Sequence, residues 1–478
     1  TVYEFNGCFW HGCLSCYPDG RDVEPPHNDR RTLQQTYEKT VARRTHLELS
    51  GYTVVEMWEC EWNAMKKDPE VKRVVDSLRL VQPLREREGL FGGRTNAIQL
   101  YAQVDGTNEK ISYVDVTSLY PSVNLYGWYP IGHPEIITTN FSPVQEYFGV
   151  IKCVVLPPRE LFHPVLPSKI NEKLMFVLCR TCAETGNQSG TCSHTDDERA
   201  LTGVWYTPEL HLALDMGYRI LTLYEVWHWR EKKQGLFEDY VKSFMKVKQE
   251  KSGWPPHCKT REERQAYIDD YHTRQGICLE YDAVEYNPGK REVAKRALNS
   301  LWGKFAQNPK NEKSAYCTDA EELNRILFNP QYVVKNVFYF NDYVVYVTYE
   351  EADPDLVAPL RRGNVFIGGF TTAQARIHLY RYLQQLDGHV KRNNLHEARV
   401  LYFDTDSVIY KTHKSQEELP LGTLLGELTS ELREDEHITT FVSAGPKNYA
   451  YETNKGAQMC KIKGFTLNYE TSRLLNFQ

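Results

Sequence analysis

Two carboxylates separated by one residue, Asp404 and Asp406, lie inside an apolar stretch of the chain. Residues 400–403 precede the pair and residues 408–410 follow it, and both runs are apolar. This pattern is typical of two buried β-strands joined by a tight turn. Carboxylates held in such a turn lose hydration and repel each other unless a cation lies between them. The segment predicts a metal-binding turn, and an ordinary Asx-turn hairpin is the alternative.

A second carboxylate segment strengthens the metal interpretation. Asp115 ends a short apolar strand, and the chain then turns into a predicted helix start at residues 119–122. Two strands that each bring a carboxylate to one point fit a two-metal phosphoryl-transfer site, with ions about 3.5–4 Å apart. One ion activates the attacking oxygen and the other stabilises the leaving oxygen. Because the ligands are oxygens, Mg²⁺ is favoured over zinc.

A basic helix is predicted at residues 288–305. Helical spacing places Arg291, Lys295 and Asn299 on one stripe, and Trp302 follows a turn later. Cations beside an aromatic ring suit a triphosphate and a stacked base. Taken alone, such a stripe is more often a solvated helix face.

Together the three segments resemble motifs A, B and C of family B DNA polymerases, in that order. The matching strings are Asp-x-x-Ser-Leu-Tyr-Pro-Ser from Asp115, Lys-x-x-x-Asn-Ser-x-x-Gly from Lys295, and Tyr-x-Asp-Thr-Asp-Ser from Tyr402. Gly92-Gly93 resembles the Gly-Gly element of the protein-primed branch, and residues 447–449 resemble its Lys-x-Tyr motif. The resemblance covers about residues 90–478 and is to polymerases of Maverick/Polinton elements, linear plasmids and related viruses.

This resemblance implies DNA-templated addition of dNTPs to a primer 3′-OH, and it assigns roles to residues. Asp115 and Asp406 would bridge two Mg²⁺ ions, and Asp404 would support them. Trp302 stands where many relatives have Tyr, which bears on nucleotide selection. The implied nucleotide-binding residues are Val116, Leu119, Tyr120, Arg291, Lys295, Asn299 and Trp302, and the implied DNA-binding residues are Gly92, Gly93, Lys447 and Tyr449. Tyr120 would be a steric gate against ribose, or else a core tyrosine.

Eight metal-ligand residues, seven of the 12 cysteines and one histidine, fall into two groups. One group is Cys179, Cys182, Cys192 and His194, whose spacing predicts a small zinc knuckle or, alternatively, a loop with partly exposed thiols. The other is Cys8, Cys13, Cys16 and Cys60, which predicts tetrahedral zinc or four buried reduced thiols.

The segment around Cys8 resembles the very-short-patch mismatch-repair endonucleases in its Gly-Cys-Phe-Trp-His loop and Trp-Glu-Cys strand. That resemblance implies a restriction-endonuclease-like fold, structural zinc on the four cysteines, and a catalytic role for His11. The metal-binding Asp of that family would fall before Thr1. We therefore expect this module to bind zinc without cutting DNA.

The predicted fold class is α+β: a family B polymerase palm and fingers with two insertions, preceded by a small α/β endonuclease-like module. The expected parts are residues 1–70 (incomplete zinc module), 71–89 (a helical connector) and 90–478 (polymerase). The insertions are expected at about 127–240 and 306–350, where the protein-primed branch grips a priming protein. The start without Met and the abrupt end predict a fragment of a longer reading frame. This sequence shows no exonuclease-like acidic strand motif, and it would contain at most the beginning of a thumb.

Composition limits the remaining classes. Hydrophobic residues make up 41% and charged residues 25%, as in ordinary globular proteins. The net charge of −6 is unexpected for a nucleic-acid binder, so basic residues must gather locally, as at residues 290–304. No apolar run approaches the ~18 residues of a membrane span, and no secretory signal begins the chain.

The expected partners are template-primer DNA, dNTPs and a terminal priming protein, without a membrane. The expected location is intracellular, and nuclear for an element integrated in a host genome. Two alternatives stay open. One is a nuclease whose active part is residues 1–62 beside a decayed polymerase, and the other is a non-catalytic DNA-binding module.

Overall fold

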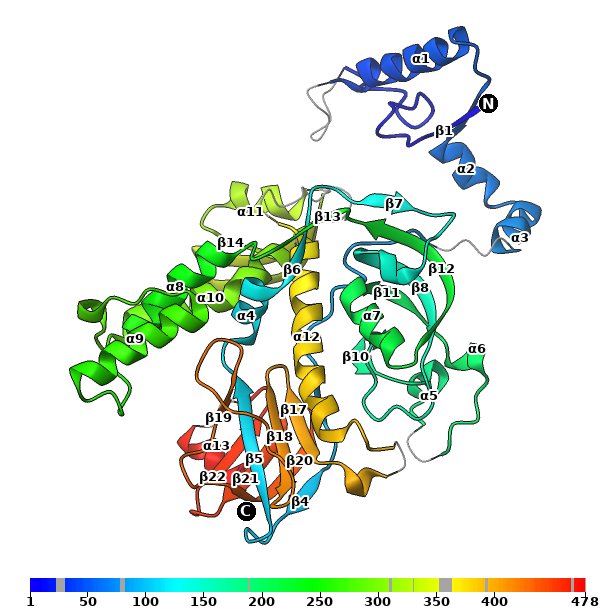
Figure 1. Cartoon of the computed structure of the whole chain (residues 1–478). Helices are drawn as coiled ribbons and strands as arrows, with labels where there is room; N and C mark the ends of the chain where they lie inside the picture. The colour runs from blue at the N-terminus through cyan, green and yellow to red at the C-terminus, as the bar shows by residue number, and fades with distance from the viewer. Residues whose placement is uncertain are drawn as a thin grey trace. The chain divides into compact units, whose positions relative to one another are not determined.

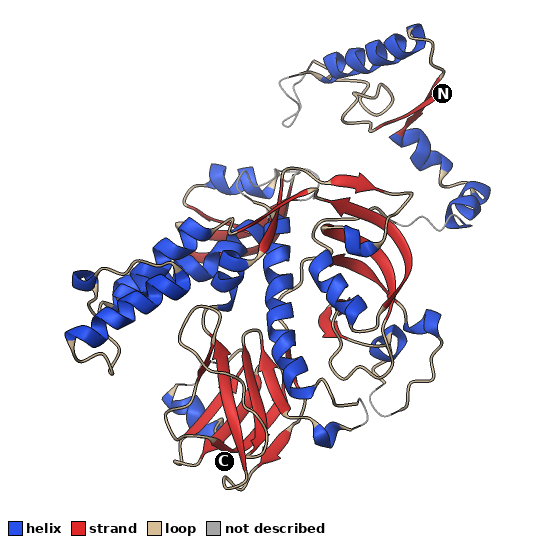
Figure 2. Ribbon diagram, viewed as in Figure 1, coloured by secondary structure: helices blue, strands red, loops and turns tan. Residues whose placement is uncertain are grey.

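The computed structural model describes residues 1–22, 31–77, 82–187, 190–308, 312–329, 331–351, 363–391, 394–465 and 468–477. They belong to two compact units, one made of residues 1–82 and 309–358 and the other of residues 83–308 and 359–478. Figure 1 labels many of the elements of each unit, and Figure 2 colours the elements by type. Among the described helices, none has the length and apolar character that crossing a membrane requires.

A nine-stranded antiparallel sheet forms the centre of the larger unit. Its main path runs β22-β21-β20-β5-β18-β17-β3, while β19 pairs with β5 and β4 pairs with β20. The strands are β3 (Thr95–Ala97), β4 (Tyr101–Gln103), β5 (Glu109–Val116), β17 (Val400–Asp404), β18 (Ser407–His413), β19 (Leu428–Ser430), β20 (Ile438–Gly445), β21 (Asn448–Thr453) and β22 (Gln458–Ile462). The predicted pair of buried strands around residues 404–406 is confirmed, as is the antiparallel palm sheet.

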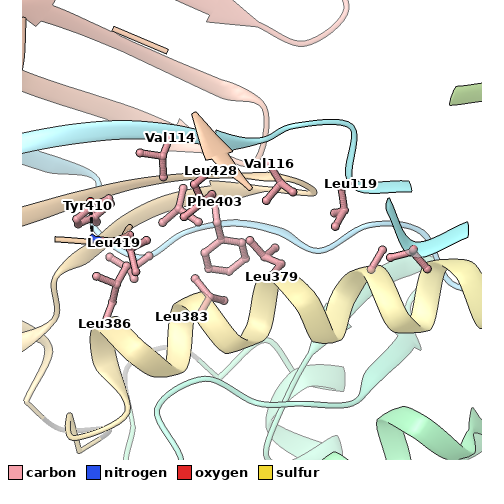
Figure 3. Close-up of a cluster of buried hydrophobic side chains, with 14 residues drawn as sticks. Val114, Val116, Leu119, Leu379, Leu383, Leu386, Phe403, Tyr410, Leu419 and Leu428 are labelled. Atoms are coloured by element: carbon pink, nitrogen blue, oxygen red, sulfur yellow. Dashed lines mark hydrogen bonds between the residues drawn. The ribbon is translucent and has the colours of Figure 1, made fainter. Parts of the chain in front are cut away.

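Helices cover one face of this sheet. In Figure 3, Leu379, Leu383 and Leu386 of α12 (Val365–Asp387) point toward Val114 of β5 and Phe403 of β17. Helix α4 (Leu119–Tyr126) joins the same buried cluster and confirms the predicted helix start. Because strand side chains alternate, the neighbours of Val114 on β5 face the other way.

The opposite face of the sheet carries aromatic side chains. Tyr113, Tyr402, Phe441, Tyr449 and Tyr451 belong to one buried cluster there. Asp115 alternates in phase with Tyr113, so it lies on this aromatic face rather than under α12.

A helical group precedes α12 in the chain. It consists of α8 (Glu238–Glu250), α9 (Arg261–Gln275) and α10 (Pro288–Ala306), the last of which confirms the predicted basic helix. The Asn287 side chain caps α10 by accepting from the Lys290 N–H, and Pro288 occupies its first turn. Leu298 of α10 is buried with Val241 and Met245 of α8. This packing sets the rotation of α10 about its axis, and with it the side on which the basic stripe predicted from Arg291 and Lys295 lies.

Residues 127–240 build a second sheet body in the same unit. Its four strands run in the order β11-β8-β12-β7, and α7 (Thr207–Asp215) packs on them. The other elements are β6 (Trp128–Ile131), β7 (Glu135–Ile137), β8 (Gly149–Leu156), β9 (Pro167–Ile170), β10 (Lys173–Phe176), α5 (Arg180–Glu184), α6 (Asp196–Arg199), β11 (Leu201–Tyr206), β12 (Arg219–His228) and β13 (Glu231–Gln234).

The smaller unit contains two parallel strands, β1 (Val2–Asn6) and β2 (Val54–Trp58). Between them runs α1 (Leu33–Leu49), which begins after a Thr32 capping box. The sequence pattern predicts a basic amphipathic helix over residues 29–49, of which residues 29–30 lie outside the described residues. Helices α2 (Glu59–Met65) and α3 (Pro69–Ser77) follow. The same unit includes α11 (Ala320–Leu327) and a sheet of β14 (Lys313–Cys317), β16 (Val344–Glu351) and β15 (Tyr332–Asn341).

One expectation for the connector is wrong. Residues 71–89 were predicted to be a helical connector, which α3 confirms as far as Ser77, yet residues 82–89 contain no helix. There the Leu84 N–H donates to Glu225 at 2.7 Å, and Arg87 donates to the carbonyls of Ala306 and Gln307 at 3.1 and 2.7 Å. Long-range hydrogen bonds hold this segment in place of the hydrogen bonds that a helix would form.

Candidate active site

Three carboxylates line one cavity of about 450 Å³ on the aromatic face of the nine-stranded sheet: Asp115, Asp404 and Asp406. Asp404 ends β17, Asp406 lies in the turn before β18, and Asp115 lies near the end of β5. Strand register brings them together, because Ser407 pairs with both Asp404 and Asp115. The Val116 N–H also donates to the Asp406 carbonyl at 2.7 Å, which ties the turn to β5.

The turn itself is held in an uncommon conformation. Thr405 has φ +61°, a left-handed backbone that a β-branched residue rarely adopts. Its N–H donates to the Arg94 carbonyl at 2.8 Å. A Cβ on Gly93 would lie 2.5 Å from the Thr405 hydroxyl oxygen, so only glycine leaves room for the turn. Such strain concentrates at functional sites.

The electrostatic surroundings of Asp115 and Asp406 differ from those of Asp404. Burial, together with the charges of Asp406 and Glu431, raises the pKa of Asp115 to about 7. Burial also raises the pKa of Asp406 to about 6, and the charge of Asp404 adds to the effect. Asp404 instead accepts hydrogen bonds from the Thr95 hydroxyl at 2.6 Å and from Lys447 Nζ at 2.8 and 2.9 Å. The charges of Lys461 and Lys295 at Asp115, and of Lys447 at Asp406, offset these effects only in part, which leaves negative charge that a bound metal ion would neutralise.

The cationic stripe of α10 approaches the same region. Burial, and then the charges of Arg291 and Lys295, lower the pKa of Lys248 to about 8. Lys248 is on α8 and donates to the Ser118 hydroxyl at 2.9 Å, in the turn between β5 and α4. Arg291 Nε donates to the Ser252 hydroxyl at 3.0 Å. Three cations thus gather beside the turn that follows Asp115.

Two aromatic residues join α4 to α10. The Tyr120 ring stacks on the Trp302 indole, with ring centroids 4.8 Å apart. Asn299 and Lys295 are exposed on α10. The side chains of Val116 and Leu119 are buried in the core under α12, so only their backbone groups are available to a nucleotide.

The predicted DNA-binding residues fall into two places. Lys447 pairs with Asp404 in the carboxylate cavity, and Tyr449 is buried, with its hydroxyl 3.0 Å from that of Tyr113. Gly93 packs against Thr405, whereas a Cβ on Gly92 would meet nothing within 4 Å. The Gly92 carbonyl accepts from Arg376 at 2.9 Å.

Sequence reasoning missed three charged residues at the site: Lys248, Glu431 and Lys461. Lys461 lines the carboxylate cavity from β22, lies over the rings of Tyr113 and Tyr449, and lowers the pKa of Asp115 against the larger opposing effects. The Glu431 N–H donates to the Tyr113 carbonyl beside β5. None of the three lies in a recognisable motif, and only the fold brings them near Asp115.

The two groups of metal-ligand residues are each assembled. In the smaller unit the ligand atoms of Cys8, Cys13, Cys16 and Cys60 lie within 4.8 Å of one another. The Cys60 N–H donates to Cys8 Sγ at 3.3 Å, and the Cys13 and Cys60 sulfurs are 3.8 Å apart. In the larger unit the ligand atoms of Cys179, Cys182, Cys192 and His194 also lie within 4.8 Å of one another.

The fold and this site define a class of protein. Residues 85–257 and 265–387, more than half of the chain, match the family described as DNA polymerase type B, organellar and viral. The chain belongs to that family.

Particular relatives agree with this assignment. A probable DNA polymerase of Neurospora intermedia is 23% identical over 401 residues, and a DNA polymerase of Kluyveromyces lactis is 23% identical over 405 residues. Each match covers 80% of this chain and 33% of the relative. The chain therefore spans about a third of the length of the curated relatives it matches.

Solved structures share the fold. The orthorhombic crystal form of Phi29 DNA polymerase is similar with a TM-score of 0.51 at 15% identity, covering 82% of this chain and 56% of that one. The same polymerase complexed with primer-template DNA gives a TM-score of 0.50 at 15% identity, covering 93% and 66%. The predicted polymerase-type α+β fold is thereby confirmed. The endonuclease-like character of the N-terminal module stays a prediction.

Proposed function

We propose that the chain catalyses DNA-templated addition of dNTPs to a primer 3′-OH. The observation that supports this most is the convergence of Asp115 on β5 and Asp406 in the β17–β18 turn on one cavity, where the pKa values of both carboxylates are raised. The family assignment supports the same reaction, because relatives of the family are DNA polymerases.

The carboxylates fit two Mg²⁺ ions. Oxygen ligands suit Mg²⁺, and a divalent cation would neutralise the charge of Asp115 and Asp406 that neighbouring lysines offset only in part. Asp115, Asp406 and the Val116 carbonyl would hold the ions, with Asp404 supporting them from its bonds to Thr95 and Lys447. When bound, the ions neutralise triphosphate charge and favour attack of the primer oxygen on the α-phosphate.

The remaining residues position the substrates. Lys295, Arg291 and Lys248 would bind the triphosphate, since they gather beside the turn after Asp115. Tyr120 and Trp302 would form an aromatic wall at the nucleotide, and Asn299 would lie beside it. Most of this catalysis is positioning and charge stabilisation.

The partners follow from the reaction. Template-primer DNA would run past Gly92, Gly93 and Lys447, and a terminal protein would prime synthesis by contacting the insertions at 127–240 and 306–350. We propose Zn²⁺ as the structural ion of Cys8, Cys13, Cys16 and Cys60, because four thiolate-forming ligands close a tetrahedral site.

Primer extension tests the proposal, using the longest natural reading frame that contains this chain. With Mg²⁺ and dNTPs the wild type should extend a primer. Asp406→Asn and Asp115→Asn should each lower the rate by more than ~100-fold, because even partners of metal ligands are worth about 10–100-fold. Asp404→Asn should be milder.

Asp435→Asn is the matched control, since Asp435 is an exposed carboxylate of the same unit outside the carboxylate cavity. Near-normal extension by Asp406→Asn would contradict the assignment. A wild type that binds DNA without extending it would favour the non-catalytic binding module, and nicking without extension would favour the nuclease.

A further inference from the structure

Residues 179–194 of the larger unit bring three thiols and one imidazole to a single point. Cys179 precedes α5 and Cys182 lies within it, while Cys192 and His194 lie in the segment before α6. All four ligand atoms are within 4.8 Å of one another. This cluster is distant in sequence from the polymerase motifs, and the proposed nucleotide addition makes no use of it.

The three sulfurs converge on the same ring nitrogen. His194 Nδ1 is 3.4 Å from Cys179 Sγ, 3.3 Å from Cys182 Sγ and 3.6 Å from Cys192 Sγ. A neutral imidazole nitrogen has one lone pair or one proton, so a hydrogen bond accounts for a single contact of the three. Hydrogen bonding alone therefore does not explain why the other two sulfurs lie so close to His194 Nδ1.

A tetrahedral ion accounts for all three contacts at once. Zinc binds sulfur at about 2.3 Å and imidazole nitrogen at about 2.0–2.1 Å, which places sulfur and nitrogen about 3.5 Å apart across a tetrahedral angle. The observed separations of 3.3–3.6 Å match this value. We propose that Cys179, Cys182, Cys192 and His194 Nδ1 form a structural zinc site.

The surroundings favour thiolates. The Cys182 N–H donates to Cys179 Sγ at 3.4 Å, and the Asn187 amide lies 3.8 Å from Cys182 Sγ. Donors directed at sulfur stabilise the deprotonated ligand that a metal requires, and such outer partners tune metal sites. Because soft thiolates select zinc over Mg²⁺, this ion differs from the pair at the carboxylates.

Both halves of the cluster are anchored to the sheet body around them. Arg159 donates to the carbonyls of Cys192 and His194 at 3.4 and 2.8 Å. The Thr181 hydroxyl donates to the Glu198 carbonyl at 2.8 Å, so α5 and α6 are joined beside the ligands. Buried Arg199 donates to the carbonyls of Pro157 and Leu178, the second of which is next to Cys179. The four ligands are therefore held in place, and they fill every tetrahedral position, as in a structural site.

The location indicates what the ion would stabilise. Arg180 and Glu184 of α5 line a groove of about 780 Å³ together with Arg85, Lys152 and Lys169. Arg180 follows the first ligand directly, so the ion would fix the α5 wall of this groove.

Metal analysis of the whole chain tests the site. With the proposed N-terminal ion included, the wild type should carry two zinc ions per chain. Cys182→Ser and His194→Ala should each lower the content by one, whereas Cys278→Ser, which removes an exposed thiol outside both clusters, should keep two. Replacing zinc with Co²⁺ should give thiolate-to-cobalt absorption, and His194→Ala should remove one equivalent of it.

A second measurement needs no variant. Chelation of the wild type should speed tryptic cleavage after Arg180, because α5 then loses its cross-link to His194, and added zinc should reverse this. Unchanged zinc content in both Cys182→Ser and His194→Ala would overturn the proposal. Complete loss of zinc from the Cys60→Ser variant would also overturn it, since all of the zinc in the wild type would then belong to the N-terminal cluster. Neither result depends on polymerase activity.

Discussion

The ring of Tyr120 stacks on the indole of Trp302 with an interplanar angle of 27° and a centroid distance of 4.8 Å. Tyr120 lies in the first turn of α4, directly after the turn that follows the carboxylate strand β5, and Trp302 comes from the cationic helix α10. The stack fixes the Tyr120 ring against the wall that would receive the nucleotide. The indole of Trp302 would extend that wall beyond the Tyr120 ring.

Sugar selection is the first consequence. Tyr120→Val removes a ring that would lie under the sugar, so the preference for dNTPs over ribonucleotides should fall by roughly 10–100-fold, the scale of steric pocket discrimination. Tyr120→Phe keeps the ring and its stack on Trp302 and should keep the preference. Competition between dNTPs and ribonucleotides in single-nucleotide extension measures the ratio. An equal ratio of dNTP to ribonucleotide incorporation in Tyr120→Val and the wild type would show that Tyr120 is a packing residue.

How far the sequence predicts this site depends on whether the information is local. The Asp-x-Asp turn, the strand before Asp115 and the cap and stripe of α10 are local patterns, and the structure has these elements as expected. Which face of the sheet carries Asp115 also follows, from alternation with Tyr113. The positions of the carboxylates in one cavity follow from strand pairing across nearly 300 residues.

The rest is determined by tertiary contacts that no window of sequence contains. Lys461 reaches the cavity only because β22 pairs with β21, and Lys248 reaches Ser118 only because α8 packs against α10. The connector prediction was wrong for the same reason, since Arg87 bonds to carbonyls near residue 306 instead of to its own helix.

The pair of Lys447 and Asp404 leads to a prediction about the primer. Lys447 Nζ would be shared between Asp404 and a primer phosphate, so Lys447→Ala should weaken primer-template binding. The slope of log affinity against log salt should flatten by about 0.9, the value of one phosphate contact on duplex DNA. Lys455→Ala is the control, because this exposed lysine bonds to the Glu434 carbonyl away from the carboxylates. Fluorescence anisotropy at several salt concentrations measures both slopes, and an unchanged slope for Lys447→Ala would leave Lys447 as a partner of Asp404 alone.

The N-terminal module should bind zinc and leave DNA intact. Glu4, the carboxylate nearest in sequence to the loop, is engaged by Arg43 at 2.7 Å, and His11 Nδ1 lies 3.0 Å from the Thr40 hydroxyl. Burial also lowers the pKa of His11, so it is a neutral imidazole at pH 7. Neither residue is poised to hold Mg²⁺ by itself.

Cys60→Ser should therefore remove one zinc ion per chain, and supercoiled plasmid should stay uncut in Mg²⁺. His11→Ala is the informative control: nicking by the wild type that His11→Ala abolishes would establish an endonuclease. Full zinc content in Cys60→Ser would contradict the cysteine assignment.

Because the pKa of Lys248 is lowered, we expect nucleotide binding to depend on pH. Its pKa of about 8 lies below the usual range of lysine, because burial and the charges of Arg291 and Lys295 disfavour the charged form. Below pH 7 the group is protonated and can bind a triphosphate, and it loses the proton as pH rises through 8. Loss of a charge-assisted hydrogen bond costs about 1.5–3 kcal/mol, and about nine tenths of the groups are neutral one pH unit above the pKa, so KM for dNTP should rise by up to about 10-fold between pH 7 and pH 9.

Lys248→Arg separates this effect from other titrations, because a guanidinium stays charged over the whole range. Its KM should stay nearly flat from pH 7 to pH 9, while Lys248→Met should have a high KM at every pH. Steady-state single-nucleotide insertion on one primer-template, repeated at constant ionic strength, provides the three profiles. If the KM values of the wild type and of Lys248→Arg rise in parallel above pH 8, the titrating group is another residue, and Lys248 serves only as the hydrogen-bond partner of Ser118.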